Sequence, residues 1–178
     1  MKRCEIFKEV IPIFAISGRE DEDIIHVSVN NLYFSAFCLK NHVNYQFKLL
    51  TCISGVDNLN AKYRFSIAYD LLSLVFSYRM RIKVYLNEIT SVDSLTNIYI
   101  NANWWEREVW DLFGLYFMNH PDLRRILTDY GFEGYPLRKD FPISGFLEVK
   151  YDLNKKQIVQ ETIELAQSFR FFKFQMPW

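Results

Sequence analysis

The sequence has few of the residues from which redox and metal sites are built. Its 178 residues include only three cysteines and three histidines, and no Cys-x-x-Cys pair occurs. Iron-sulfur clusters and structural zinc sites need about four suitable ligands. The odd, widely spaced cysteines Cys4, Cys38 and Cys52 also do not form the framework of a secreted disulfide protein, so a reducing compartment is expected. We therefore expect the chain to hold no cluster and no metal ion.

Motifs for nucleotide, flavin and hydrolase chemistry are missing as well. The sequence contains no Gly-x-Gly-x-x-Gly, Walker, Gly-x-Ser-x-Gly or His-Glu-x-x-His pattern. The formal net charge is zero, so the chain lacks the positive potential that draws proteins to nucleic acid. No segment approaches the roughly 20 consecutive apolar residues of a membrane span. We expect neither a nucleic-acid partner nor a direct membrane span.

Glycine and proline are scarce, whereas aromatic residues are abundant. Six Gly and five Pro stand against sixteen Phe and eleven Tyr, a bias that A/T-rich coding produces and that points to an organelle-encoded gene. Residues 1–17 make a poor signal or transit peptide because acidic residues interrupt them. The aromatic share of 17% exceeds the needs of one core of this size. Some aromatic side chains are therefore expected on surfaces that partners cover.

The first half of the chain predicts helices and strands in alternation. The first twenty residues predict a short helix that breaks at Ser17-Gly18, followed by a charged turn over residues 20–23. Alternating apolar residues predict a strand over residues 25–29, and helical spacing predicts a helix over residues 31–40 that Asn30 or Asn31 could cap. A strand is expected over residues 45–53, and turn chemistry over residues 55–60.

The residues that follow predict a β-hairpin. Apolar side chains alternate over residues 63–71, and a bulge at Leu71-Leu72 would restore the alternation through Tyr78. A second strand over residues 80–86 would pair with the first, with a basic outer face. The expected fold is α+β: a mixed β-sheet with helices packed against it over residues 1–128. Glycine and proline punctuate residues 129–178, which are expected to form an extended C-terminal interaction arm.

Residues 103–113 predict an amphipathic helix. Asn103 and Glu106 resemble a capping box, and Gly114 can end the helix in the left-handed conformation. Glu106 and Glu108 point about 200° apart on a helix, so they cannot share a substrate. Arg107 and Asp111 are four residues apart and can pair on the exposed side.

A second helix is predicted from Pro121, with Asp122 complementing its dipole. His120 could ligate a metal, but His26 and His42 are distant in sequence and no ligand lies at zinc-motif spacing. A hydrogen-bonded structural histidine is the favoured interpretation.

Taken together, two runs of residues resemble the signature of a known family. They are Glu106-Arg107-Glu108-Val-Trp-Asp111-Leu-Phe113-Gly114 and His120-Pro-Asp-Leu-Arg124-Arg125-Ile-Leu127. The family is that of the thirty-kilodalton subunit of respiratory complex I (NADH:ubiquinone oxidoreductase). The resemblance covers roughly the last three-quarters of the chain. The carboxyl-terminal sequence is similar to that of the mitochondrial and proteobacterial branch of the family.

The resemblance implies a structural subunit of the peripheral arm of the complex, which has enzymatic activity only as part of that complex. It implies that NADH, FMN, iron-sulfur clusters and ubiquinone are bound by partner subunits, chiefly the forty-nine-kilodalton subunit and neighbouring iron-sulfur subunits. The implied location is the matrix side of the mitochondrial inner membrane, with the cytoplasmic face of a bacterial membrane as the alternative.

No catalytic, cofactor-binding or metal-binding residue is expected in the chain itself. Ten residues are expected to serve interfaces or packing: Glu106, Arg107, Glu108, Asp111, His120, Asp122, Arg124, Arg125, Arg138 and Asp140. Two rival functions remain open, a stand-alone adaptor and a metal-dependent hydrolase that uses His120 and Asp122.

Overall fold

The structure is a computed structural model that describes residues 11–18 and 23–170. The chain divides into two compact units, Met1–Asp140 and Phe141–Trp178, and each is described by itself. The first unit extends beyond residue 128, where the sequence predicts that the arm begins.

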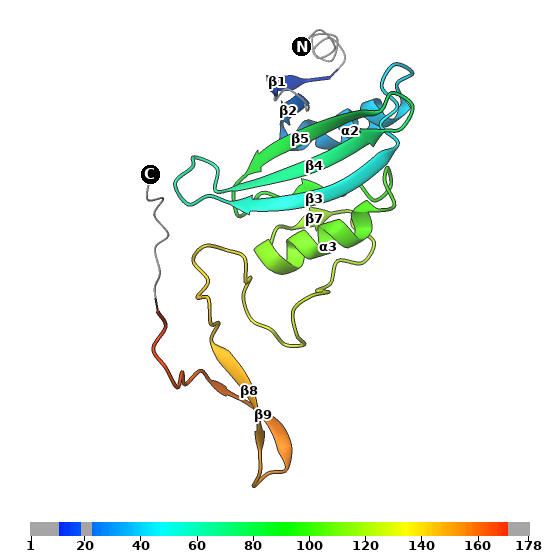
Figure 1. Cartoon of the computed structure of the whole chain (residues 1–178). Coiled ribbons are helices and arrows are strands. Elements are labelled where there is room, and N and C mark those ends of the chain that lie inside the picture. The colour runs from blue at the N-terminus through cyan, green and yellow to red at the C-terminus, as the bar shows by residue number, and fades with distance from the viewer. Residues whose placement is uncertain (1–10, 19–22, 171–178) are drawn as a thin grey trace. The chain divides into compact units, whose positions relative to one another are not determined.

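The first unit contains a five-stranded sheet with the strand order β1-β2-β5-β4-β3 (Figure 1). Its strands are β1 (Ile13–Gly18), β2 (Asp23–Val27), β3 (Leu49–Asp57), β4 (Phe65–Ser73) and β5 (Tyr78–Leu86). The β2–β5 pair is parallel, and the other three pairs are antiparallel. The predicted mixed sheet is therefore confirmed.

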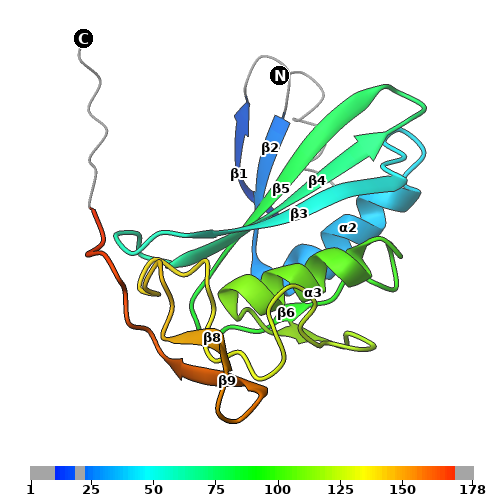
Figure 2. The same cartoon turned by 60° about the horizontal axis from the view of Figure 1, so that its bottom comes forward.

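Two helices cover one face of this sheet (Figure 2). They are α2 (Leu32–Asn41), which follows the short 3-10 helix η1 (Val29–Asn31), and α3 (Ala102–Phe113). A small parallel pair, β6 (Val92–Asp93) with β7 (Phe117–Met118), completes the unit. The α+β prediction is confirmed, as is the helix expected over residues 31–40.

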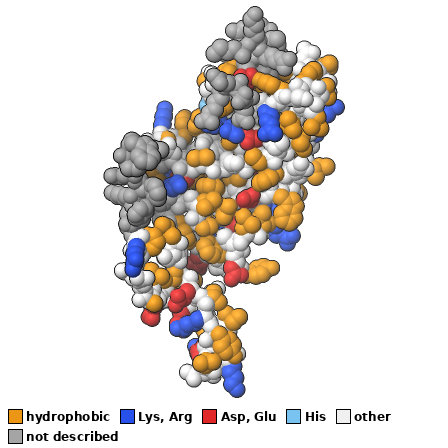
Figure 3. All heavy atoms as spheres, in the orientation of Figure 1, with side chains coloured by type: hydrophobic (Ala, Val, Ile, Leu, Met, Phe, Trp, Pro, Cys, Tyr) orange, Lys and Arg blue, Asp and Glu red, His pale blue; other side chains and the backbone are white. Residues whose placement is uncertain are grey.

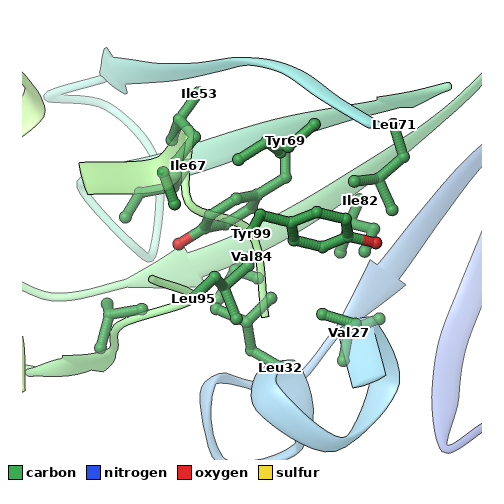
Figure 4. Packing of buried hydrophobic residues seen from close by; sticks show 14 of the residues in the cluster. Val27, Leu32, Ile53, Ile67, Tyr69, Leu71, Ile82, Val84, Leu95 and Tyr99 are labelled. Atoms are coloured by element: carbon green, nitrogen blue, oxygen red, sulfur yellow. The ribbon is translucent and has the colours of Figure 1, made fainter. Parts of the chain in front are cut away.

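The core lies between the sheet and the helices, because alternate strand residues face the helices. In β4 these are Phe65, Ile67, Tyr69 and Leu71, all at most 1% exposed. Figure 4 shows this cluster, in which side chains from β4 and β5 lie against Leu32, Leu95 and Tyr99.

The β4–β5 hairpin is confirmed, but the bulge predicted inside it is wrong. Pairing runs without a break from Phe65 opposite Leu86 to Ser73 opposite Tyr78. Ser73 therefore takes the buried position after Leu71, and residues 74–77 form an exposed turn. An irregularity occurs instead in β3, between Leu50 and Cys52.

The helix predicted near the amino terminus is wrong where the structure describes it. Residues 13–18 form β1, which pairs with β2, and residues 1–10 and 19–22 lie outside the described residues. Isolated helices this short are marginal, whereas an edge strand gains hydrogen bonds from its neighbour. Asp23, expected in a turn, begins β2, and Val29 leaves the predicted strand to begin η1.

Two further local predictions differ from the structure. Asn31 occupies the capping position of α2, but its side chain makes no capping hydrogen bond. Gly55 lies inside β3 rather than in a turn. A Cβ atom at Gly55 would lie 2.7 Å from the Phe113 ring, so this glycine allows α3 to approach the sheet closely.

The described part of the second unit contains one hairpin, β8 (Leu147–Asp152) with β9 (Gln157–Thr162). Neither α-helix in the described ranges has the length and apolar character that crossing a membrane requires.

Candidate functional site

Helix α3 carries the residues that the sequence singled out, and Gly114 ends it as predicted. Gly114 is left-handed at φ 74°, and its N–H donates to the carbonyl of Trp110 at 2.9 Å. A Cβ atom at this position would lie 2.5 Å from Tyr135 and 2.7 Å from Arg138. The glycine therefore serves both the turn and the packing of the chain that returns past the helix end.

The predicted capping box is wrong. Asn101 occupies the capping position without a side-chain hydrogen bond, and Glu106 points into the protein. Its carboxylate accepts hydrogen bonds from Ser94 Oγ at 2.6 Å and from the backbone N–H of Leu95 at 2.7 Å. Burial raises the pKa of Glu106 to about 7, although these two hydrogen bonds oppose the rise.

The charged side of α3 is largely buried, contrary to the prediction of an exposed side. Glu106 and Asp111 are fully buried, Arg107 is 7% exposed, and Glu108 is half-buried. The reason is that two segments supply hydrogen-bond partners. Residues 94–95 bond to Glu106, and residues 120–128, the passing segment, bond to Arg107 and Asp111.

Asp111 holds the end of this passing segment. Its carboxylate accepts three consecutive backbone N–H groups, from Ile126 at 3.1 Å, Leu127 at 2.7 Å and Thr128 at 2.9 Å. The Thr128 hydroxyl and Arg125 also donate to it. Burial alone would raise the pKa of Asp111, but the hydrogen bonds from Thr128, Leu127 and Ile126 hold the pKa below its ordinary value.

Asp111 explains two further corrections. The helix predicted from Pro121 does not form, because the N–H groups of residues 126–128 bond to the carboxylate rather than to a preceding helical turn. The predicted Arg107–Asp111 pair is also wrong. Arg107 Nε donates instead to the carbonyl of Arg124 at 3.2 Å, and its guanidinium lies over the Trp104 ring.

His120 is a hydrogen-bonded structural histidine, as favoured from the sequence. The backbone N–H of Asp122 donates to Nδ1 at 3.1 Å, so Nδ1 is an acceptor and the ring proton of the neutral form is on Nε2. Nε2 lies 3.2 Å from the carbonyl oxygen of Asn103 and 3.9 Å from Oε2 of Glu106. Both nitrogens are engaged, and the exposed Asp122 carboxylate pairs with Arg124 instead.

Residues 135–140 contact the carboxyl end of α3 and, through Arg64, the end of the β3–β4 hairpin. Arg138 Nε donates to the carbonyl of Phe113 at 2.7 Å, its guanidinium lies over Tyr135, and it pairs with Glu88. Next along the chain, two ion pairs join Arg64 to Asp140 at 2.9 Å and to Asp57 at 2.9 Å.

The structure thus brings most of the predicted residues together around α3. Arg138 lies at its carboxyl end, Asp140 pairs with Arg64 instead, and Glu108 takes no part in the network described above. Sequence reasoning missed Ser94, Thr128, Glu88, Asp57 and Arg64. No local signal could have found them, because their partners lie 7 to 76 residues away along the chain. Within the described ranges, no three His, Cys, Asp or Glu side chains gather as a metal site would require.

The β8–β9 hairpin has one apolar and one charged face. Leu147, Val149, Tyr151 and Ile158 share a face, because Val149 lies opposite Gln160 and Tyr151 opposite Ile158. These four side chains are 50 to 71% exposed, and hydrophobic side chains are visible along this hairpin at the lower end of Figure 3. A two-stranded hairpin is at best marginally stable alone, so this face is the clearest candidate interaction surface among the described residues.

Comparison with known proteins gives three consistent results. The profile of the family described as "Respiratory-chain NADH dehydrogenase, 30 Kd subunit" matches residues 25–147. NADH-ubiquinone oxidoreductase subunit 9 of Reclinomonas americana is 53% identical over 154 residues, which cover 86% of this chain and 76% of the relative. NADH dehydrogenase [ubiquinone] iron-sulfur protein 3 of Marchantia polymorpha is 53% identical over 157 residues, 88% of this chain and 80% of that protein.

Solved structures show the same likeness. A trypsin-resistant fragment of Nqo5 aligns with a TM-score of 0.55 at 26% identity, and the match covers 68% of this chain and 97% of the fragment. A chain of an archaeal membrane-bound sulfane sulfur reductase aligns with a TM-score of 0.68 at 23% identity, over 80% of this chain and 85% of that one. This second likeness shows the fold alone.

Proposed function

The chain belongs to the family of the 30 kDa subunit of respiratory-chain NADH dehydrogenase, and from this premise we propose that it is a structural core subunit of the peripheral arm of complex I. In this role it supports electron transfer from NADH to ubiquinone, and the assembly of the complex, by holding neighbouring subunits in place. The enzymatic activity belongs to the complex, and the isolated chain has none.

The apolar face of the β8–β9 hairpin carries this proposal. Four exposed apolar side chains on one face, with charged residues on the other, suit a surface that another protein covers. Exposed aromatic side chains of α2, Tyr33, Phe34 and Phe37, add a second surface of the same kind. We propose that the forty-nine-kilodalton subunit and neighbouring iron-sulfur subunits cover these surfaces.

We further propose that the chain itself binds no redox centre. The relatives named iron-sulfur protein 3 carry that term in their names, but this sequence has three cysteines in all and no Cys-x-x-Cys pair. A cluster generally needs four cysteine thiolates, or two thiolates with two histidines, and among the described residues no such group of side chains gathers. NADH, FMN, the clusters and ubiquinone are accordingly assigned to partner subunits.

The proposed location is the matrix side of the mitochondrial inner membrane, peripheral to the bilayer. Its support is the resemblance of the carboxyl-terminal residues to the mitochondrial branch of the family. The cytoplasmic face of a bacterial membrane is the alternative, and fractionation of the source organism's membranes distinguishes the two.

The test of the scaffold role uses the two faces of the hairpin. The double substitution Val149→Thr with Ile158→Thr makes the apolar face polar, and Lys150→Gln with Glu161→Gln is the matched control on the opposite face of the same strands. Burying each apolar side chain contributes about 1.5 to 3 kcal/mol, so the apolar-face variant is expected to lose about tenfold or more of the assembled complex on a native gel. Normal assembly of that variant would contradict the scaffold role.

The two rival functions make different demands on the chain. A metal-dependent hydrolase needs a free ligand nitrogen on His120, but both ring nitrogens are hydrogen-bonded within the chain. It also predicts stoichiometric metal in the isolated protein. A stand-alone adaptor predicts recovery of the chain outside the respiratory membrane.

A further inference from the structure

A buried carboxyl group and a buried histidine lie beside each other under α3, and the scaffold role does not require either of them to be ionisable. Glu106 Oε2 and His120 Nε2 are 3.9 Å apart, and both side chains are fully buried. Because a buried charge without a partner is costly, such a pair is a place where protonation and conformation are coupled.

The groups that face Glu106 come from three elements. Ser94 and Leu95 donate to it from the residues after β6, and His120 faces it from the passing segment. Tyr69 faces it from β4, where burial first and the Glu106 charge second raise the tyrosine pKa. Within the described residues no Lys or Arg pairs with Glu106. Its neighbour Arg107 bonds to the carbonyl of Arg124 instead.

His120 cannot supply the missing positive charge without breaking a hydrogen bond. Its Nδ1 accepts the N–H of Asp122, and a charged imidazolium would carry a proton on that nitrogen and face another donor. The hydrogen bond from Asp122 therefore requires an unprotonated Nδ1. Ionisation of Glu106 leaves a buried carboxylate whose printed hydrogen bonds come from Ser94 and Leu95.

A chain of hydroxyl groups connects Glu106 with the surface. Ser94 Oγ lies 2.6 Å from Glu106 Oε2 and 2.9 Å from Thr96 Oγ1, and Thr96 is only partly buried. Hydroxyl groups rotate and can act as donor or acceptor, so this chain can reverse its direction when Glu106 gains or loses a proton. The buried carboxyl group can thus equilibrate with solvent without unfolding.

We propose that Glu106 and His120 form a pH-sensitive lock on the 120–128 segment, closed while Glu106 is protonated and loosened when Glu106 ionises. Within this segment, it is the ring of His120 that faces the Glu106 carboxylate. When the first residues of this segment move away from α3, water reaches the ionised Glu106 carboxylate. Asp111 continues to hold residues 126–128. The lock controls how firmly residues 120–128, which follow α3 in the chain, are held against that helix.

The direction of the pH dependence follows from the pKa. The pKa of Glu106 in the folded protein, about 7, is above the ordinary value of 4.5. Over the pH range between these two values the closed state therefore binds more protons than the open state. Opening becomes easier as the pH rises through this range.

The test is amide hydrogen exchange of the full chain, with the N–H of Asp122 as the reporter. In the wild type, its protection factor relative to intrinsic exchange is expected to fall by about tenfold or more between pH 5 and pH 8. Glu106→Gln should remove this pH dependence, because its amide stays neutral. The control Glu108→Gln, on the same helix but half-buried, should behave like the wild type.

A constant protection factor in the wild type, or an equal fall in Glu106→Gln, would overturn the proposal. If Glu106→Gln does not fold, carbon-13 NMR of the wild-type carboxyl group decides the question. A titration midpoint near 7 supports the lock, and a midpoint below 5 overturns it.

Discussion

At the scale of single residues, two carboxylates of α3 have opposite effects on the same stretch of chain. Asp111 is bonded by three backbone N–H groups and by Arg125, which favours its charged form. No Lys or Arg among the described residues pairs with Glu106, and burial raises its pKa. Asp111, whose carboxylate holds the passing segment, lies five residues after Glu106, whose ionisation loosens the same segment. The difference lies in which donors the segment presents, and not in the residue type.

Substitution of Asp111 tests the anchor. Asp111→Ala leaves Arg125 and the three backbone N–H groups without their buried partner, and is expected to lower the free energy of unfolding by about 3 kcal/mol or more. Urea unfolding measures this. Asp122→Ala is the matched control, because that carboxylate is exposed and its pair with Arg124 contributes less than about 1 kcal/mol. Equal losses in the two variants would contradict the anchor.

The same anchor has a pH dependence of the opposite sign to that of Glu106. The pKa of Asp111 is lowered in the folded protein. Its contribution to the free energy of unfolding is therefore fully present above the pKa that its carboxyl group has in the unfolded chain. That contribution is lost as the pH falls through the folded-state value.

At the scale of elements, the strands whose residues alternate strictly could be predicted from the sequence, and the segments whose course depends on a distant side chain could not. The β4–β5 hairpin and α2 follow from periodicity alone. The segment after Pro121 contains helix-start residues, but Asp111 takes its N–H groups. Likewise, the glycine at position 55 resembles a turn signal, and only the position of Phe113 shows its packing role.

The candidate site shows the same division. The sequence singled out Glu106, Asp111 and His120, because an amphipathic helix and a family signature coincide there, and the structure places all three side chains around α3. It placed Asp111 on an exposed side, because the chain that buries it is contributed by residues up to 17 positions further along. Burial of charge is a tertiary property that helical periodicity does not contain.

Gly114 allows a prediction at this scale with a matched control. Gly114 and Gly131 are both left-handed, at φ 74° and 73°, but a Cβ atom would collide with Tyr135 and Arg138 only at Gly114. Gly131→Ala is expected to cost roughly 1 to 2 kcal/mol from backbone conformation alone. Gly114→Ala should cost at least about 1 kcal/mol more, measured by urea unfolding. Equal costs would mean that the packing at the helix end relaxes freely.

At the scale of the whole molecule, the division into two units predicts that stability and assembly can be separated. Truncation after Asp140 removes the second unit but keeps the pairs of Arg138 and Asp140. The truncated chain should keep its thermal midpoint within about 4 °C, the shift that about 1 kcal/mol produces in a domain of this size. It should fail to join the complex on a native gel. A large loss of stability would show that the second unit supports the first.

The parallel pairing of β2 with β5 also sets an order of events during synthesis. Residues 23–27 pair with residues 80–84, and β1 is joined to the sheet through β2 alone. β1 and β2 therefore leave the ribosome long before β5, the strand that pairs with β2. They cannot enter the sheet until the β4–β5 hairpin has been made. Until that moment β1 and β2 have only each other to pair with, and exposed apolar strands of this kind are what chaperones recognise.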